Sequence, residues 1–123
     1  MEYSVTLPGL YIEGKEGRAI AVDLTKVANL PSTVPFPHMT VLYRQTPFSK
    51  EEYQAIVKEA ERWIKDYNHG MSTVYFMLEP WGPRSKLIKG DLETFGQHLR
   101  DMFSLEGPQD RPLHVQLSQT PKF

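Results

Sequence analysis

Two short segments of this chain begin with a histidine and carry a hydrogen-bonding side chain two residues later. The first pairs His38 with Thr40, and the second pairs His114 with Gln116. Side chains alternate between the faces of a β-strand, so residues i and i+2 project from the same face. Each segment, if extended, therefore presents an imidazole beside a polar group. Two imidazoles that face one cleft can act as acid and base in one reaction near neutral pH.

Both segments have the composition of strands with one buried face. Prolines precede each histidine, and we expect strands over residues 38–43 and 114–118. The residues that alternate with the polar ones are expected to enter a core: Met39, Val41, Tyr43, Val115 and Leu117. The face that carries the histidines is then left open to a ligand.

The rest of the pattern predicts an α+β fold. A helix over residues 50–67 has apolar residues at helical spacing and starts with a capping box of Ser49 and Glu52. A sheet with two helices on one face would bury both helical stripes and leave its other face open. The other expected elements are a β-hairpin over 3–12 that turns at Pro8–Gly9, strands over 18–24 and 73–79, a loop over 80–90 or a short strand around Leu87-Ile88, and a helix over 92–103.

Composition limits the class of protein. The chain has 123 residues, 40% hydrophobic and 24% charged, and we expect one domain over residues 1–123. A net charge of −1 argues against long duplex nucleic acid as a partner, although a local patch can still bind a small anion. The absence of cysteine excludes disulfides and thiolate metal sites and is compatible with a reducing compartment.

Neither a targeting signal nor a metal motif is found in the sequence. The N-terminus has no signal-peptide pattern, and no apolar stretch approaches the roughly 20 residues of a membrane helix. We therefore expect a cytoplasmic monomer without a membrane partner. The motif strands offer no third metal ligand and no H-E-x-x-H spacing occurs, so we expect no metal and no cofactor.

Residues 80–90 contain side chains that suit a nucleotide. Trp81 can stack on a base, and Arg84 and Lys86 can contact phosphates. The alternative is a solvated, charged loop with the tryptophan packed on the edge of the sheet. Arg44 and Arg111 flank the two motifs and either add positive charge there or lie on the surface.

Taken together, the two motifs resemble those of the 2H (two-histidine) phosphoesterase superfamily, which includes the LigT-like RNA cyclic phosphodiesterases and small phage enzymes. The first, His38-Met39-Thr40-Val41, matches the family pattern H-x-[S/T]-h fully, where h is apolar. The second, His114-Val115-Gln116-Leu117, matches except for glutamine in place of threonine or serine. The resemblance covers about residues 17–119, with a helix, a strand and a helix between the motifs.

This resemblance implies an antiparallel α+β fold with two helices on the outer face and a central open cleft. It also implies metal-independent hydrolysis of a 2′,3′-cyclic phosphate, an RNA end or a small cyclic oligonucleotide. His38 and His114 would be the acid–base pair, with Thr40 and Gln116 holding the phosphate and Ser118 as a further hydroxyl. The family pattern does not say which histidine is the acid.

Two other interpretations of the sequence remain open. Glutamine at position 116 is longer than threonine, and its presence is compatible with a module of the same fold that binds a nucleotide or RNA end without cleaving it. A structural or interaction protein without a small-ligand site is the third possibility, in which both histidines would affect stability alone.

Overall fold

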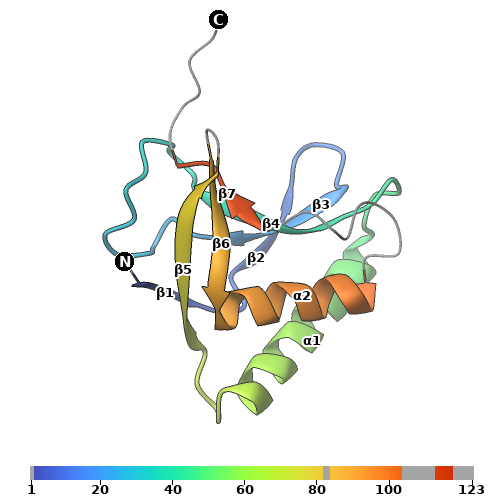
Figure 1. Cartoon of the computed structure of the whole chain (residues 1–123). Helices are drawn as coiled ribbons and strands as arrows, with labels where there is room; N and C mark the ends of the chain where they lie inside the picture. Colours follow the sequence, from blue (N-terminus) through green and yellow to red (C-terminus); the bar gives the residue numbers. More distant parts are fainter. Residues whose placement is uncertain (1, 82–83, 104–112, 118–123) are drawn as a thin grey trace, which may run out of the picture.

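The computed structural model describes residues 2–81, 84–103 and 113–117, with only the backbone described at residues 80–81 and 84–89 (Figure 1). The described elements confirm the expected α+β class, with antiparallel strands and two helices. In chain order they are β1 (Glu2–Thr6), β2 (Leu10–Glu13), β3 (Ala19–Asp23), β4 (His38–Tyr43), α1 (Lys50–Tyr67), β5 (Thr73–Trp81), β6 (Arg84–Gly90), α2 (Asp91–Phe103) and β7 (His114–Val115).

The described strands form one antiparallel sheet in the order β1-β5-β6-β7-β4-β3-β2. The β-hairpin expected over residues 3–12 is wrong, because β1 pairs with β5 and β2 pairs with β3. Only Leu7, Pro8 and Gly9 separate β1 from β2 in the chain. Four Cα steps span at most about 14 Å, so the sheet curls until its two ends approach each other.

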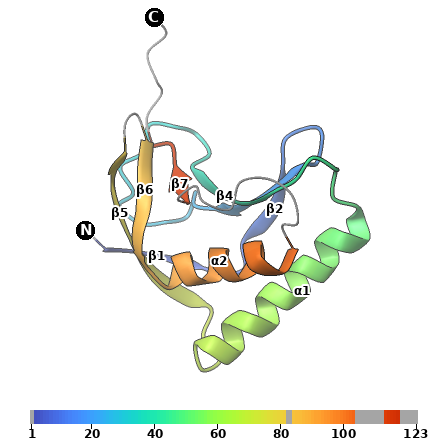
Figure 2. The same ribbon diagram turned by 45° about the vertical axis from the view of Figure 1, so that its right-hand side comes forward.

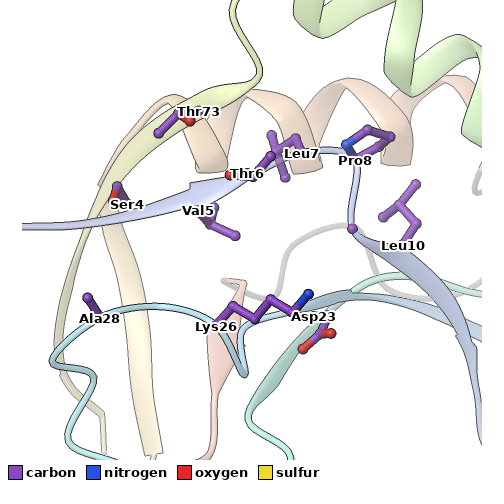
Figure 3. A pocket seen from close by; sticks show the side chains of 11 residues that line it. Ser4, Val5, Thr6, Leu7, Pro8, Leu10, Asp23, Lys26, Ala28 and Thr73 are labelled. Atoms are coloured by element: carbon purple, nitrogen blue, oxygen red, sulfur yellow. The ribbon is translucent and has the colours of Figure 1, made fainter.

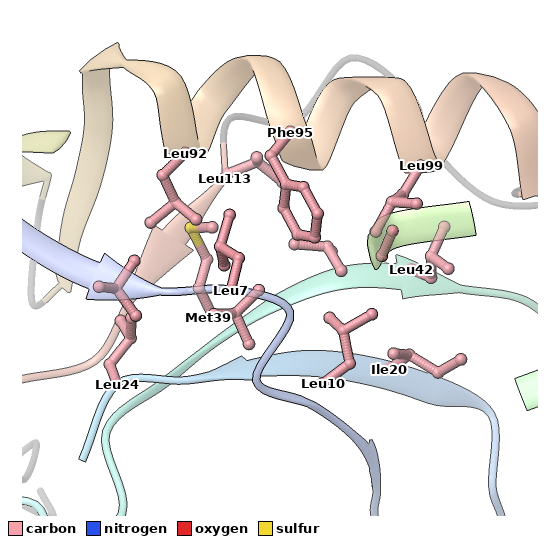
Figure 4. Close-up of a cluster of buried hydrophobic side chains, with 14 of the residues drawn as sticks. Leu7, Leu10, Ile20, Leu24, Met39, Leu42, Leu92, Phe95, Leu99 and Leu113 are labelled. Carbon is pink, nitrogen blue, oxygen red and sulfur yellow. The ribbon is translucent and has the colours of Figure 1, made fainter. Parts of the chain in front are cut away.

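Both helices lie on the same side of the curled sheet (Figures 1 and 2). Helix α2 packs against β4, β5 and β6, and α1 packs against α2. The core fills the space between this layer and the sheet (Figure 4), and among the described residues no polar or charged residue is buried in it. Its largest fully buried side chains include Ile20, Met39, Leu42, Phe76, Phe95 and Leu99.

Helix α1 spans the predicted residues because its ends are specified locally. The Ser49 hydroxyl accepts a hydrogen bond from the Glu52 backbone N–H, and the Glu52 carboxylate accepts one from the Ser49 N–H, which completes the capping box. After Asn68, His69 and Gly70 take left-handed backbone conformations that end the helix. Neither described helix has the length and apolarity that a bilayer-spanning helix requires.

Helix α2 approaches the sheet closely at Gly96. A Cβ atom at this position would lie 2.5 Å from Leu113 Cδ1 and 3.3 Å from Val41 Cγ1. A glycine therefore allows α2 to contact the residue that leads into β7 and a residue of β4 at once. This contact helps to set the positions of both histidine strands from the core side.

Strand β4 contains a bulge that changes which side chains are exposed. Ile20 pairs with Leu42 and Ala21 pairs with Thr40, so Val41 is an extra residue opposite β3. Val41 and Leu42 are both buried as a result. Tyr43, which the alternation placed in the core, is instead 43% exposed and lines a hollow together with Thr40.

The loop expected over residues 80–90 is wrong as well. Residues 80–81 end β5 and residues 84–90 form β6, and the two strands pair antiparallel with Trp81 opposite Arg84. The short strand expected near residues 87–88 is part of β6, which continues to Gly90. Strand β6 then pairs with β7, and Lys86 is the register partner of His114.

Candidate functional site

The two histidine strands are neighbours in the middle of the sheet. Met39 of β4 pairs with Val115 of β7, and both side chains are buried in the core. Because side chains alternate along a strand, His38 and His114 leave the sheet on the opposite face from these two residues. The core contacts of Met39 and Val115 thus fix the face from which each imidazole projects.

Both histidines line one pocket of about 190 Å³. The other lining residues are Thr40, Gln116 and Glu13. Four of the residues expected from the two motifs are therefore brought together, from strands that are separated by about seventy positions in the chain. Glu13 is the fifth, and it was not anticipated from the sequence.

Glu13 holds both polar groups of the first motif. Its Oε1 lies 2.7 Å from Nε2 of His38, and its Oε2 accepts a hydrogen bond of 2.5 Å from the Thr40 hydroxyl. The two side chains of the ion pair are about one-third exposed, with values of 34% for His38 and 30% for Glu13. One carboxylate thus bridges an imidazole and a hydroxyl inside the pocket.

Small residues on β3 allow this bridge. Strand β3 lies between β2 and β4, so the Glu13 side chain must cross it to reach the first motif. Ala19 is the register partner of Glu13, and Ala21 is the register partner of Thr40. Directly paired residues share a face of the sheet. The surface that Glu13 crosses is therefore formed by two methyl groups.

The contacts of the His38 ring indicate its protonation state. Its Nδ1 lies 2.9 Å from the backbone carbonyl oxygen of Phe36, and its Nε2 faces the Glu13 carboxylate. A carbonyl oxygen and an ionised carboxylate can only accept, so the ring donates from both nitrogens, as an imidazolium does. The hydrogen bond with Glu13 is the main reason that the pKa of His38 is raised, and burial opposes it.

The same contact acts on the partner carboxyl group. The hydrogen bond from His38 is the main reason that the pKa of Glu13 is lowered; burial opposes this shift, and the hydrogen bond from Thr40 adds to it. Each member of the pair therefore favours the charged form of the other. Both groups are therefore favoured in their charged forms over the pH range between the lowered pKa of Glu13 and the raised pKa of His38.

Two further groups surround the His38 ring. Asp23 is the register partner of His38 and accepts hydrogen bonds from the Thr25 N–H at 2.8 Å and the Thr25 hydroxyl at 2.6 Å. The hydrogen bond from the Thr25 hydroxyl is the main reason that the pKa of Asp23 is lowered; burial opposes this shift, and the bond from the Thr25 N–H adds to it. The Tyr11 ring meets the imidazole edge to face, with ring centres 6.2 Å apart. Burial first, then Glu13 and Asp23, raise the pKa of this tyrosine.

A second hollow of about 470 Å³ adjoins the two-histidine pocket. It shares Glu13 and Thr40 with that pocket and adds the side chains of Lys15, Arg18 and Tyr43. It therefore combines two cations, and the Glu16 carboxylate 3.3 Å from Arg18, with an exposed aromatic ring. Tyr43 reaches it only because of the bulge in β4.

Another hollow, of about 670 Å³, lies elsewhere. It is lined by β1, the link to β2 and the segment after β3, and Figure 3 shows Asp23 and Lys26 on the side opposite Leu7 and Pro8. It shares no lining residue with the two-histidine pocket. Its one carboxylate is already engaged by Thr25, so size alone does not make it a catalytic centre.

Several expected residues lie outside what the structure describes. Ser118 and Arg111 fall outside the described residues. Trp81, Arg84 and Lys86 have a described backbone in the β5–β6 hairpin, but their side chains are not described. These contacts stay predictions.

Three other side chains that could titrate or carry positive charge lie away from the two-histidine pocket. Arg44 contacts Glu52 at 2.7 Å and lies over the Phe48 ring, so it supports the start of α1 instead of the site. His69 ends α1. His98 stacks on Trp63 with ring centres 5.2 Å apart.

A signal for Glu13 does exist in the sequence. Tyr11 and Glu13 alternate with Leu10 and Ile12, and two glycines follow before the next strand. A hairpin turning at residues 14–18 would have placed Glu13 beside Ala19 on the polar face. The expected hairpin within residues 3–12 instead placed residue 13 in the following turn, so the pairing of Glu13 with Ala19 was not predicted.

Among the described residues, no group of three histidine, cysteine, aspartate or glutamate side chains is placed to hold a metal ion. Comparison of the chain with protein-family models, with curated proteins and with solved structures found no match.

Proposed function

We propose that this protein is a phosphodiesterase of the 2H type, which uses two histidines and no metal to hydrolyse a 2′,3′-cyclic phosphate, an RNA end or a small cyclic oligonucleotide. The observation that carries the proposal is the shared pocket of His38, Thr40, His114 and Gln116. Attack on phosphorus needs a base for the incoming hydroxyl and an acid for the departing oxygen. Two imidazoles around one phosphate supply both.

His38 is the acid in this reaction. Both ring nitrogens lie against oxygen atoms, and the raised pKa favours the charged ring to higher pH than in an ordinary histidine. A charged imidazole cannot accept a proton, so His114 takes the role of base. The sequence alone left this assignment open, and the contacts of His38 favour one direction.

Thr40 and Gln116 would hold the non-bridging oxygens of the phosphate, which keep their bonds to phosphorus throughout the reaction. A hydroxyl and an amide N–H₂ group both donate hydrogen bonds to negative charge as it develops at phosphorus. They flank the histidines in the same pocket. The glutamine extends further from its strand than threonine does, which favours a different substrate position from that of family members with two hydroxyls.

The size of the pocket supports a small reacting group. About 190 Å³ is less than the roughly 300–1,000 Å³ of a typical small-molecule site, so it accommodates a phosphate but not a complete nucleotide. The adjoining hollow, with Lys15, Arg18 and Tyr43, provides room and matching chemistry for the rest of such a ligand. Cations suit a further phosphate, and an exposed ring suits a base.

Turnover in the presence of EDTA tests the proposal. We expect the protein to hydrolyse at least one member of a panel of 2′,3′-cyclic nucleotides and cyclic di- and trinucleotides. His38→Ala and His114→Ala should each lower kcat by about 10²–10⁴-fold, the usual contribution of acid–base catalysis. His69→Asn is the matched control, because His69 has a φ of 53° that asparagine tolerates and it ends α1. Full activity in either pocket variant would overturn the proposal.

A binding module that does not cleave its ligand is the second candidate. Two observations favour it: glutamine stands at position 116, and the Glu13 carboxylate already bonds to His38 and Thr40. This candidate predicts saturable nucleotide binding, with a raised melting temperature, and no product from any member of the panel. Product that is lost in both histidine variants would exclude it.

A further inference from the structure

Glu13 occupies the groups that a bound phosphate would use. A phosphate oxygen would accept hydrogen bonds from Nε2 of His38 and from the Thr40 hydroxyl, and the two carboxylate oxygens of Glu13 do so here. A carboxylate and a phosphate are both oxyanions, and their oxygen atoms accept such hydrogen bonds. They cannot accept the same N–H and O–H at full strength together.

Glu13 is not placed like a carboxylate that orients a catalytic histidine from behind. That task falls to the backbone carbonyl of Phe36, which binds Nδ1 at 2.9 Å. Glu13 binds the other nitrogen, and its side chain lines the pocket itself. Both ring nitrogens are therefore engaged, and a ligand can reach the imidazole only by replacing Glu13.

We propose that Glu13 is an internal competitor for the phosphate position and thereby determines which anions the pocket accepts. The inference rests on the proposed function, because it assumes that His38 and Thr40 hold a phosphate. A tethered carboxylate acts at a high effective concentration, so a bare anion binds poorly. A phosphoester that also fills the adjoining hollow makes extra contacts and displaces Glu13 more readily. Glu13 thus selects for nucleotides over free phosphate.

The displaced carboxylate has cations beside it. Glu13 also lines the adjoining hollow, together with Lys15 and Arg18. Nε of Arg18 is buried and, within the described part of the chain, has no hydrogen-bond acceptor in good geometry, although Glu16 Oε2 lies 3.3 Å away. A carboxylate that turns toward Arg18 would meet a donor that still requires an acceptor, and it would leave Lys15 and Tyr43 to the ligand.

The affinity for inorganic phosphate tests the inference without any need for turnover. In Glu13→Gln the negative charge is gone and a single amide oxygen cannot satisfy both donors, so the dissociation constant should fall at least tenfold in a calorimetric titration. Asp23→Asn is the matched control. Asp23 also adds negative charge beside His38 but makes no hydrogen bond to it, and asparagine keeps the acceptor for Thr25. This control should change the constant by less than threefold.

The outcomes separate this inference from the proposed reaction. Phosphate affinity in Glu13→Gln that falls, stays constant or rises no more than in Asp23→Asn overturns the competitor role. If neither the wild type nor Glu13→Gln binds phosphate, the competitor role is also overturned. Tighter phosphate binding in Glu13→Gln supports the role even if neither protein hydrolyses a cyclic phosphate, a result that would count against the reaction alone.

Discussion

The two histidine motifs share a sequence pattern but are supported differently. Strand β4 has six residues and pairs with β3 at five positions, whereas the described part of β7 has two residues and pairs with β4 at a single position. His38 is held by Phe36 and Glu13, and both contacts favour the charged form of its ring. The position of β7 depends on its neighbours β4 and β6 and on the core contacts of Val115 and Leu113. Two motifs of similar sequence are thus held by different contacts, which suits them to different roles.

The difference teaches which part of the site is set in advance. The first motif presents a fixed imidazolium, which suits the donation of a proton to a leaving group. The second presents an imidazole on a strand of two residues and an amide just after that strand, and core packing of Leu113 and Val115 fixes its position. We therefore expect changes at the first motif to alter chemistry and charge, and changes under the second to alter position.

Removing each histidine in turn should have the largest effect and should reveal its role. Both alanine variants should lose about 10²–10⁴-fold in kcat. The residual rate of His38→Ala should no longer fall at alkaline pH, because the acid that loses its proton there is gone. His114→Ala should keep that alkaline decline, which lies above pH 6.5 because the pKa of His38 is raised. Profiles of kcat/KM between pH 5 and 9 measure this, because they report the free protein, in which Glu13 contacts His38. An alkaline decline retained in His38→Ala would reverse the assignment.

Removing the hydroxyl of the first motif should have the next largest effect. Thr40→Val keeps the shape of the side chain but deletes the donor, and losing one such donor typically costs about 10²-fold in kcat. Thr40→Ser is the matched control, because it keeps the hydroxyl and should retain most of the activity. Steady-state kinetics on the best substrate of the panel compare the two. Equal rates in the valine and serine variants would remove Thr40 from the site.

Filling the space at Gly96 should act on the second motif through its position. The new methyl of Gly96→Ala would lie 2.5 Å from Leu113 Cδ1, next to the start of β7, and such overpacking costs about 1–3 kcal/mol of unfolding free energy. Gln97→Ala, at an exposed position of the same helix, is the control and should stay within about 0.5 kcal/mol. Urea unfolding measures both. A neutral Gly96→Ala would show that α2 does not restrain the entry to β7.

The smallest expected effect is the pH dependence of stability from the pair of Glu13 and His38. The pKa of Glu13 is lowered, so its contribution is present above about pH 4.5 and is lost as pH falls through the folded value. The pKa of His38 is raised, so its contribution is complete below about pH 6.5 and is lost as pH rises through the folded value. The pair therefore stabilises most between these limits.

Comparing the wild type with Glu13→Gln measures that contribution. The pair is about one-third exposed, so solvent screening keeps the difference within about 1 kcal/mol. Melting temperatures at pH values from 4 to 8 should differ most between pH 4.5 and 6.5 and should converge above that range. A gap that widens steadily toward pH 8 would contradict a charged His38.

Local signals explain what the sequence could predict. The capping box at Ser49 and the stop after Asn68 are set by neighbouring residues, and α1 was predicted with the correct limits. The partner of β1 could not be inferred in the same way, because β5 is about seventy residues distant in the chain. Likewise, Pro80 and the following Gly82-Pro83 indicate a loop, whereas pairing with β5 and β7 makes residues 84–90 a strand.

The candidate site likewise contains residues that the local pattern predicts and residues that only long-range pairing brings into place. Two residues of each motif were predicted because i and i+2 spacing alone puts them on one face. Tyr43 was assigned to the wrong face, because the bulge at Val41 depends on pairing with β3. Glu13 was missed because its contact with His38 crosses an intervening strand and depends on the small size of Ala19 and Ala21. Contacts of this kind follow from tertiary structure and not from local pattern.

The central claim is that the imidazoles at positions 38 and 114 bind one phosphate between them. A phosphate titration followed by NMR at the ring protons of the four histidines tests it in a single sample, with His69 and His98 as internal references. We predict that the signals of His38 and His114 shift together and give one dissociation constant, while the other two stay unchanged. Shifts in only one of the pocket histidines, or two different dissociation constants, would contradict the account.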